Sequence, residues 1–156
     1  MKYAEAEVLV DELIDKFLPV TRGISVAGSV RRKVAEPNDI ELVAMLDPKQ
    51  LVKWVDLVSG LQVTKGNARG RYIQFTYKLK QIDLFLTQPD NFGLILATRT
   101  GSASFSHFYL AGGWVAAGYR CVDGMLRGPA GKVSVREEED LFTLIDKPWV
   151  DPEKRT

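Results

Sequence analysis

The stretch of residues 28–41 constrains the fold more than any other part of the chain. An apolar run at residues 24–27 precedes it and predicts a short buried strand. Residues 38–45 predict a second strand, and this strand carries Asp39 and Glu41. Because successive side chains of a strand point to opposite faces, these two carboxylates are expected on one face. The stretch therefore predicts two strands and a connecting turn that end in an acidic pair.

The two ends of this stretch offer different chemistry. Two carboxylates on one face repel each other unless a cation lies between them, and hard oxygen ligands suit Mg²⁺ or Mn²⁺. At the other end, Gly28 and Ser29 predict a turn that another group can approach closely, and Arg31 and Arg32 follow. A small turn, a hydroxyl and guanidinium groups are typical ligands of phosphate. A metal site beside a phosphate site indicates a nucleoside triphosphate as the ligand.

The length, the charge balance and the cysteine count narrow the class of protein. A chain of 156 residues fits one domain or two small lobes that share a core. The 21 Lys and Arg residues exceed the 20 Asp and Glu residues by one, which argues against a strongly basic DNA-coating protein. Cys121 is the only cysteine, so a reducing compartment is expected. The acidic N-terminus does not resemble a signal peptide and no apolar run reaches membrane-spanning length, so we expect an intracellular, cytoplasmic monomer without a membrane partner.

Helical and strand periodicities alternate along the chain. Predicted helices cover residues 3–18, 49–58, 89–97 and 102–117, and a last one follows Ser134. Predicted strands also cover residues 61–64, 72–77, 81–87, 119–122 and 132–135. This order predicts an α+β (mixed α/β) fold with a mixed sheet flanked by helices and a small C-terminal α+β lobe. The boundary is expected near Pro89, which would divide residues 1–88 from residues 89–156.

Some details of these helices are also predicted. The apolar stripes are expected to contain Val8, Leu9, Leu13, Ile14, Phe17 and Leu18 in the first helix, and Leu51, Val52, Val55 and Val58 in the second. Ser134 and Glu137 have the spacing of a capping box at the start of the last helix. Gly112 and Gly113 weaken the helix that contains them, and either a close helix crossing or a frayed end would explain the pair.

Asp83 is the only charge in the predicted strand at residues 81–87. An ionised group inside an apolar strand costs several kcal/mol unless it is paired or coordinates a metal. Asp83 is therefore expected to be the third metal ligand beside Asp39 and Glu41. Residues 65–71 form a basic turn that contains two glycines, and such a turn is either a solvated hairpin or a site of DNA contacts.

Gly28-Ser29, Arg32, Asp39-x-Glu41 and the later Asp83 together resemble the signature of the nucleotidyltransferase superfamily. More narrowly, they resemble the DNA polymerase beta family (family X), in which a Gly-Ser-x-Arg-Arg run precedes the first metal carboxylate. Thr100-Gly101-Ser102 is similar to the turn that leads the nucleotide-binding helix of that family. Residues 134–155 are similar to its closing segment, so the resemblance covers nearly all of residues 24–156.

The resemblance implies an enzyme that adds a nucleotide to the 3′-hydroxyl of primer-template or gapped DNA and releases pyrophosphate, as in short-gap repair. Two Mg²⁺ or Mn²⁺ ions would be bound by Asp39, Glu41 and Asp83, and Asp83 would accept the hydroxyl proton. The implied nucleotide-binding residues are Gly28, Ser29, Arg32, Thr98, Arg99, Gly101, Ser102 and Ser106. The implied DNA-contacting residues are Lys65, Arg69, Arg71 and His107, and the last would stack on a base.

The chain also departs from the family pattern. Only one predicted helix precedes the palm-like segment, so the lyase and fingers regions of the larger members are expected to be missing, as in minimal palm-plus-thumb polymerases known from a virus. Thr98-Arg99 replaces a Tyr-Phe pair that limits room beside the sugar. Ala103, Ser106, His107 and Leu110 replace the Asp, Asn, Lys and Arg that check the nascent base pair. Two alternatives therefore stay open: a transferase that acts on a small molecule, a protein or an RNA end, and a catalytically silent DNA-binding or scaffold module.

Overall fold

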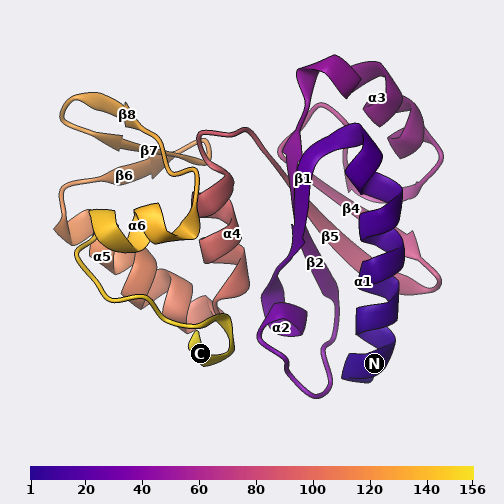
Figure 1. The fold of residues 1–156 in the computed structure, drawn as a ribbon, viewed down its shortest axis with the longest axis horizontal. Helices are drawn as coiled ribbons and strands as arrows, with labels where there is room; N and C mark the ends of the chain where they lie inside the picture. The colour runs from indigo at the N-terminus through magenta and orange to yellow at the C-terminus, as the bar shows by residue number, and fades with distance from the viewer.

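The computed structural model describes all 156 residues and shows a mixed α+β protein built on two sheets (Figure 1). The larger sheet has the strand order β1-β2-β5-β4-β3. Its strands are β1 (Thr21–Val26), β2 (Ile40–Leu46), β3 (Gln62–Gly66), β4 (Tyr72–Tyr77) and β5 (Lys80–Thr87). β2 and β5 run parallel, and the other neighbouring pairs are antiparallel. The predicted fold class, with a mixed sheet flanked by helices, is confirmed.

Helices cover both faces of this sheet. α1 (Tyr3–Phe17) and α3 (Leu51–Ser59) lie on one face, and α4 (Phe92–Thr100) lies on the other (Figure 1). Between β1 and β2, α2 (Gly28–Arg31) forms a single helical turn. Short 3-10 turns cover Leu18–Val20, Pro48–Gln50 and Pro152–Lys154. No helix combines the length and the apolar character that crossing a lipid bilayer requires.

Strand alternation separates the apolar core from the functional face of the sheet. On β5, Ile82 and Leu84 are fully buried in the cluster beneath α1 and α3. Asp83 and Phe85 alternate with them and line a cavity on the opposite face. Each apolar side chain removed from water contributes on the order of 1.5–3 kcal/mol, and a slip of one residue would expose all of them. Core burial therefore fixes the register that holds Asp83 in place.

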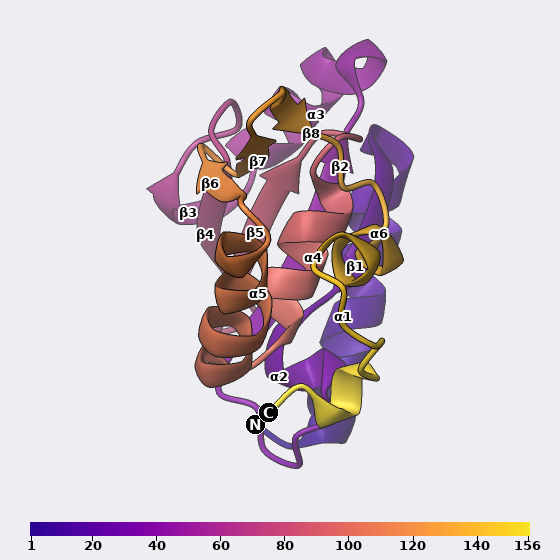
Figure 2. The same cartoon turned by 90° about the vertical axis from the view of Figure 1, so that its left-hand side faces the viewer.

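A second, smaller lobe follows β5 (Figure 2). Its sheet contains β6 (Arg120–Val122), β7 (Met125–Gly128) and β8 (Gly131–Val133). Its helical part contains η3 (Phe105–Ala111), a π-helical segment, followed by α5 (Gly112–Ala116) and α6 (Glu138–Leu144). Ten buried apolar residues between Leu94 and Ile145 form its core, which is separate from the 17-residue cluster between Ala6 and Leu86. α4 carries residues of this second core and also packs on the large sheet.

The buried faces of α1 and α3 contain most of the predicted stripe residues, with three exceptions. Val8, Leu18 and Val52 were expected to be buried but are 58%, 49% and 84% exposed. On α3, Trp54 takes a buried position instead, and its indole Nε1 donates a hydrogen bond to the Ala68 carbonyl at 2.9 Å. Both helices carry enough apolar residues for two overlapping stripes, and the spacing alone does not select between them.

Two helix boundaries were also predicted wrongly. The helix expected over residues 89–97 begins at Phe92, because the Gln88 N–H donates to the Asn91 side chain at 2.9 Å and forms a turn first. It then continues as far as Thr100 and ends at Gly101, inside the Thr-Gly-Ser motif. The helix expected over residues 102–117 contains the π-helical turns of η3, which a regular helical period does not predict.

The capping of the last helix involves other residues than expected. Glu137 and Asp140 form the capping box of α6: the Asp140 carboxylate accepts from the Glu137 N–H at 3.0 Å. The hydroxyl of Ser134 donates to Asp90 at 3.2 Å instead. The middle strand of the small sheet, β7, was not predicted at all, because its four residues include Met125 and Gly128 and show no clear alternation.

Gly112 and Gly113 lie where η3 gives way to α5. A Cβ at Gly113 would lie 2.9 Å from Cδ1 of Ile145 and 3.4 Å from Cε of Lys147. A Cβ at Gly112 would meet only the carbonyl oxygen of His107, at 3.8 Å. Of the two explanations that the sequence left open, close packing therefore holds for Gly113 and leaves Gly112 unconstrained.

These adjacent glycines predict opposite responses to substitution. Gly112→Ala is expected to raise the free energy of unfolding by about 0.5–1 kcal/mol, because alanine has the higher helix propensity and the new methyl group meets no neighbour. Gly113→Val is expected to lower it by roughly 1–3 kcal/mol through overpacking against Ile145. Urea denaturation of both variants measures the difference. Equal effects at the two positions would show that the packing at Gly113 is not limiting.

Candidate active site

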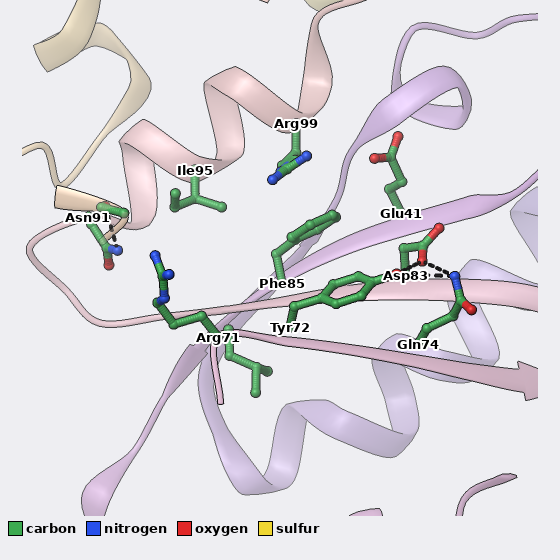
Figure 3. A pocket seen from close by; sticks show the side chains of 11 residues that line it. Glu41, Arg71, Tyr72, Gln74, Asp83, Phe85, Asn91, Ile95 and Arg99 are labelled. Atoms are coloured by element: carbon green, nitrogen blue, oxygen red, sulfur yellow. Dashed lines mark hydrogen bonds between the residues drawn. The ribbon is translucent and has the colours of Figure 1, made fainter. Parts of the chain in front are cut away.

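The three predicted carboxylates lie on β5, on β2 and just before β2, two neighbouring strands of the large sheet. In the parallel pairing of β2 with β5, Glu41 lies directly opposite Asp83. Asp39 is the residue before β2, two positions from Glu41, so the strand period carries it to the same side. Figure 3 shows the Glu41 and Asp83 side chains on neighbouring strands at one end of a cavity. The structure thus brings together the acidic residues that the sequence singled out.

The position of Glu41 depends on Gly28. Gly28 begins α2 with φ +58°, a left-handed conformation that favours glycine. A Cβ at this position would lie 1.9 Å from Oε2 of Glu41, so no side chain fits there. The sequence predicted that some group approaches the backbone at Gly28. That group is the Glu41 carboxylate of the same chain.

Asp83 is buried, at 7% exposure, and three neutral donors satisfy it. The Tyr72 hydroxyl and Nε2 of Gln74 (3.0 Å) donate to its Oδ1, and Nε2 of Gln81 (3.1 Å) donates to its Oδ2. Burial and the bond to Asp83 raise the pKa of Tyr72 to about 12, so the phenol stays a donor. These partners were not predicted from the sequence, although Gln81 shares the strand face of Asp83. Gln74 lies on β4, directly opposite Asp83.

Burial and neighbouring negative charge raise the proton affinity of Asp39 and Glu41. Burial, together with the charges of Asp39 and Asp83, raises the pKa of Glu41 to about 7, while Arg99 and Arg32 act in the opposite direction. Burial and the charge of Asp83 also raise the pKa of Asp39. Three carboxylates therefore share a region in which full ionisation is unfavourable without a cation.

The donor set fits a divalent cation by its chemistry. Carboxylate oxygens are the ligands that Mg²⁺ and Mn²⁺ prefer. In this structure, however, no three acidic, histidine or cysteine side chains gather closely enough to hold a metal ion. Glu41 lies against Gly28, and Asp83 accepts from Tyr72 and both glutamines. Coordination of one ion by all three carboxylates would therefore require rotation of these side chains.

A cavity of about 540 Å³, here named the α2 cavity, lies between the α2 turn and the C-terminal end of α4. Seven of the eight predicted nucleotide-binding residues line it, and the eighth, Gly28, is buried beneath Glu41. Asp39 and Glu41 also line the α2 cavity. The predicted phosphate ligands and two of the three carboxylates therefore face one space.

Arg32 carries an unused donor in the α2 cavity. Its Nη1 donates to the Thr100 carbonyl at 2.9 Å, which ties the α2 turn to α4. Its Nε is buried and has no hydrogen-bond partner. An unpaired buried donor costs about 1–3 kcal/mol, and a ligand oxygen would satisfy it. Because Arg32 lines the cavity, its positive guanidinium suits an anionic ligand such as phosphate.

The turn between α4 and η3 lies at the other side of the α2 cavity, and hydrogen bonds of its own serine hydroxyl groups stabilise it. Ser106 donates to the Thr98 carbonyl at 2.7 Å, and the Ser102 hydroxyl accepts from the Phe105 N–H at 3.1 Å. A Cβ at Gly101 would lie 2.6 Å from the Phe105 ring. The backbone of this turn is therefore fixed before any ligand arrives.

A second cavity of about 570 Å³, here named the β4 cavity, lies on the Asp83 side (Figure 3). Its lining includes Arg71, Tyr72, Asp83, Phe85 and Asn91. Glu41 and Arg99 line both cavities, whereas Asp39 lines only the α2 cavity and Asp83 only the β4 cavity. The two cavities therefore meet at the carboxylates.

The predicted DNA-contacting residues are not brought together. Arg71 lines the β4 cavity, but Lys65 and Arg69 are part of neither cavity, and Lys65 is exposed on the edge strand β3. His107 is also exposed and lies outside both cavities, with its ring edge-on to Phe108 at a centroid distance of 4.7 Å. Of the basic turn, only Arg71 therefore joins the candidate site.

An ion cluster that the sequence did not predict holds the α2 turn against the second lobe. Arg31 donates to both oxygens of Glu138, at 2.8 and 2.6 Å, and to the Thr100 hydroxyl at 2.7 Å. Arg155, which is fully buried, also donates to Glu138. Arg31 and Glu138 are far apart in the sequence, so no local pattern predicts this cluster. It joins the two lobes beside the α2 cavity.

Comparison with known proteins adds no assignment. No protein-family model matches the chain, and no curated protein matches it. The functional inference therefore rests on the cavities, the carboxylates and the guanidinium groups described above.

The ion cluster predicts a pH-dependent contribution to stability. Burial by itself would raise the pKa of Glu138, but the hydrogen bonds and charges of Arg31 and Arg155 outweigh it and lower the pKa. A lowered pKa means that the ionised carboxylate stabilises the fold above its ordinary titration range and that this contribution is lost as the pH falls below about 4. Glu138→Gln is expected to lower the free energy of unfolding at pH 7 by roughly 3 kcal/mol, because both guanidinium groups lose their counter-charge.

Urea denaturation at pH 7 and at about pH 3.5 measures this contribution. The gap between the wild type and Glu138→Gln should narrow at the lower pH. Glu139→Gln is the matched control, since Glu139 is the exposed neighbour on α6. A gap that is the same at both pH values would show that packing, rather than charge, accounts for the loss.

Proposed function

We propose that this protein is a nucleotidyltransferase that moves a nucleotide from a nucleoside triphosphate to an acceptor hydroxyl and releases pyrophosphate. The acceptor favoured by the resemblance to family X is the 3′ end of a DNA strand paired to a template. The observation that carries the proposal is the position of the carboxylates at the junction of two cavities. Such an arrangement allows two substrates to approach one set of acidic ligands from different sides.

The α2 cavity is suited to the triphosphate. Ser29 offers a hydroxyl, and Arg32 offers a buried Nε without a partner. Arg32 is held by its bond to the Thr100 carbonyl, so its guanidinium does not need to be ordered when the ligand binds. The lining of the cavity carries charge of both signs, with Arg32 and Arg99 positive and Asp39 and Glu41 negative. A ligand that carries both phosphates and bound cations matches this distribution.

The β4 cavity is suited to the acceptor, because Asp83 lines this cavity and does not line the α2 cavity. In the proposed step, the acceptor oxygen gives its proton to the Asp83 carboxylate and forms a bond to the α-phosphorus. The bond between the α-phosphorus and the bridging oxygen of pyrophosphate breaks, and the electron pair leaves with pyrophosphate. Divalent cations bound by Asp39, Glu41 and Asp83 would neutralise charge on the phosphates and on the attacking oxygen.

A different acceptor is the second candidate, and the second lobe favours it. Leu110, at a position where family X has an arginine beside the nascent base pair, is fully buried in the core of the lobe. Ala103 lines the α2 cavity where the family has an aspartate, and it offers no polar side chain. Neither residue can check a base pair by hydrogen bonding. A transferase that acts on a small molecule, a protein or an RNA end does not need such a check.

A labelled primer on gapped DNA, incubated with the four deoxynucleoside triphosphates and Mg²⁺ or Mn²⁺, tests the proposal. We expect extension by the nucleotide complementary to the template. Asp39→Asn and Asp83→Asn should each reduce it by about a thousandfold or more, because each removes a metal ligand. Asparagine keeps one side-chain oxygen that can accept from Tyr72 and Gln74, and the Gln81 amide can turn its own oxygen toward the new NH2 group, so the Asp83 variant should fold.

Asp11→Asn, an exposed carboxylate of α1 without a hydrogen bond, is the matched control and should extend the primer normally. Addition without regard to the template, or addition only to RNA or to a small alcohol, would favour the second candidate. No transfer to any acceptor would leave a DNA-binding or scaffold module and overturn the proposal.

Metal binding gives a prediction that is independent of activity. Mn²⁺ is expected to raise the melting temperature of the wild type, because a bound cation relieves repulsion among carboxylates that are costly to ionise together. Removal of the ion with EDTA should reverse the shift. Glu41→Gln should melt at nearly the same temperature with and without Mn²⁺. A shift of equal size in both proteins would place the ion elsewhere.

A further inference from the structure

The β4 cavity contains two guanidinium groups that the proposed transfer step does not use. Arg71 immediately precedes β4, and Arg99 lies in the last turn of α4. Figure 3 shows their side chains pointing into the cavity from opposite walls. The carboxylates lie at one end of this space, and the two arginines lie farther along it. Positive charge in a cavity next to an acidic centre needs a separate explanation.

Neither guanidinium forms a close ion pair within the protein. Arg99 forms no ion pair with any carboxylate, and no hydrogen bond joins its side chain to another group. The only acidic neighbour of Arg71 is Asp123, at 3.9 Å, and both side chains are mostly exposed. A pair of this length in water contributes little. Both arginines are therefore free to bind an anion.

Arg99 is nevertheless held in a defined position. Its Cζ lies 4.1 Å from the centre of the Phe85 ring, a cation–π contact. The Phe85 ring packs in turn on Tyr72, with a centroid distance of 5.2 Å and a tilt of 34°. A guanidinium that stacks on a ring keeps its N–H groups at its edge, where they remain available to phosphate oxygens. Because Arg99 covers one face of Phe85, Tyr72 is the ring of the cavity on which a planar group can stack.

The space around Arg71 is built by the turn between β6 and β7. Nδ2 of Asn91 donates to the Gly124 carbonyl at 2.9 Å, which fixes this turn at the N-terminal end of α4. Gly124 has φ +78°, and a Cβ there would lie 3.3 Å from Nη1 of Arg71. The glycine therefore leaves room for the guanidinium. On the strand side, the Arg71 carbonyl accepts from the Leu86 N–H at 2.9 Å, so its backbone is fixed as well.

We propose that Arg71 and Arg99 bind a phosphate group of the acceptor. The inference rests on the proposed transfer reaction, because it is Asp83 that marks the β4 cavity as the acceptor side. The acceptor is then a nucleoside monophosphate unit with a free hydroxyl, either a free mononucleotide or the terminal unit of a strand. Its phosphate lies between the two guanidinium groups, its planar base lies against Tyr72, and its hydroxyl reaches Asp83.

This assignment narrows the acceptors that the chain can use. An alcohol, a sugar or a protein hydroxyl without a phosphate would leave both guanidinium groups unpaired and would bind weakly. A phosphate bound by two arginines loses affinity as the salt concentration rises, because screening weakens the charge interaction. Arg99 lines both cavities and can also contact the triphosphate, whereas Arg71 lines the β4 cavity alone. Arg71 is therefore the decisive residue.

Calorimetric titration tests the proposal with three probes: adenosine, adenosine 5′-monophosphate and a deoxyadenosine trinucleotide. Arg71→Gln is expected to weaken the binding of the two phosphorylated probes about tenfold or more, and to leave adenosine unchanged. Arg22→Gln on β1 removes an exposed guanidinium outside both cavities and should bind all probes as the wild type does. Equal affinity for the two phosphorylated probes supports a free mononucleotide, and tighter binding of the trinucleotide supports a strand end.

Separate titrations distinguish this inference from the proposed function. Arg32→Gln should weaken the binding of a nucleoside triphosphate with Mn²⁺, and Arg71→Gln should not. If the triphosphate binds and is transferred, but Arg71→Gln binds the monophosphate normally, the phosphate site is wrong and the transferase proposal stands. If Arg71→Gln loses pyrophosphate instead of the monophosphate, the cavity receives the leaving group and the acceptor assignment is overturned. If the monophosphate needs Arg71 but no transfer occurs, the site is real and the transferase proposal fails.

Discussion

The parallel pairing of β2 with β5 is the constraint on which the candidate site depends. It places Glu41 beside Asp83, although 42 positions of the chain separate them, and the buried neighbours Ile82 and Leu84 fix that register. Parallel strands need a long crossover, and here α3, β3 and β4 provide it. The same crossover returns β4 alongside β5 and supplies Tyr72 and Gln74 to Asp83. The same crossover connection therefore places Glu41 beside Asp83 and supplies hydrogen-bond donors to Asp83, the most deeply buried of the three carboxylates.

The second lobe contributes by completing walls rather than by adding acidic groups. α4 packs on the sheet through Phe92, Ile95 and Leu96 and carries Thr98 and Arg99 into the cavities. The cluster of Arg31, Glu138 and Arg155 joins the lobes beside it. Truncation of Glu138 would leave two guanidinium groups, one of them fully buried, without their shared counter-charge, which is costly. The shape of the α2 cavity is thus tied to a distant part of the chain.

Much of the site could be predicted because it follows from local patterns. Strand alternation placed Asp39 and Glu41 together, and the isolation of Asp83 in an apolar strand drew attention to it. The partners of Asp83 were missed because they depend on which residues of β4 face β5, and that register appears only after the turn between the strands is known. The bonds from Arg31 to Glu138 span 107 positions and leave no local trace. Most of the predicted stripe residues of α1 and α3 do face the core, but Val8, Leu18 and Val52 do not, because apolar residues occur at more helical positions than one face can bury.

The contact between Gly28 and Glu41 restricts the order in which the two positions can change during evolution. A larger residue at position 28 meets two independent penalties, a collision with the carboxylate and a left-handed backbone. Shortening of Glu41 would relieve the first penalty and leave the second. A viable path must therefore alter the acidic residue before the glycine and must also rebuild the turn between them. The turn and the acidic pair behave as one inherited unit, even though the residues that compose it lie on different elements.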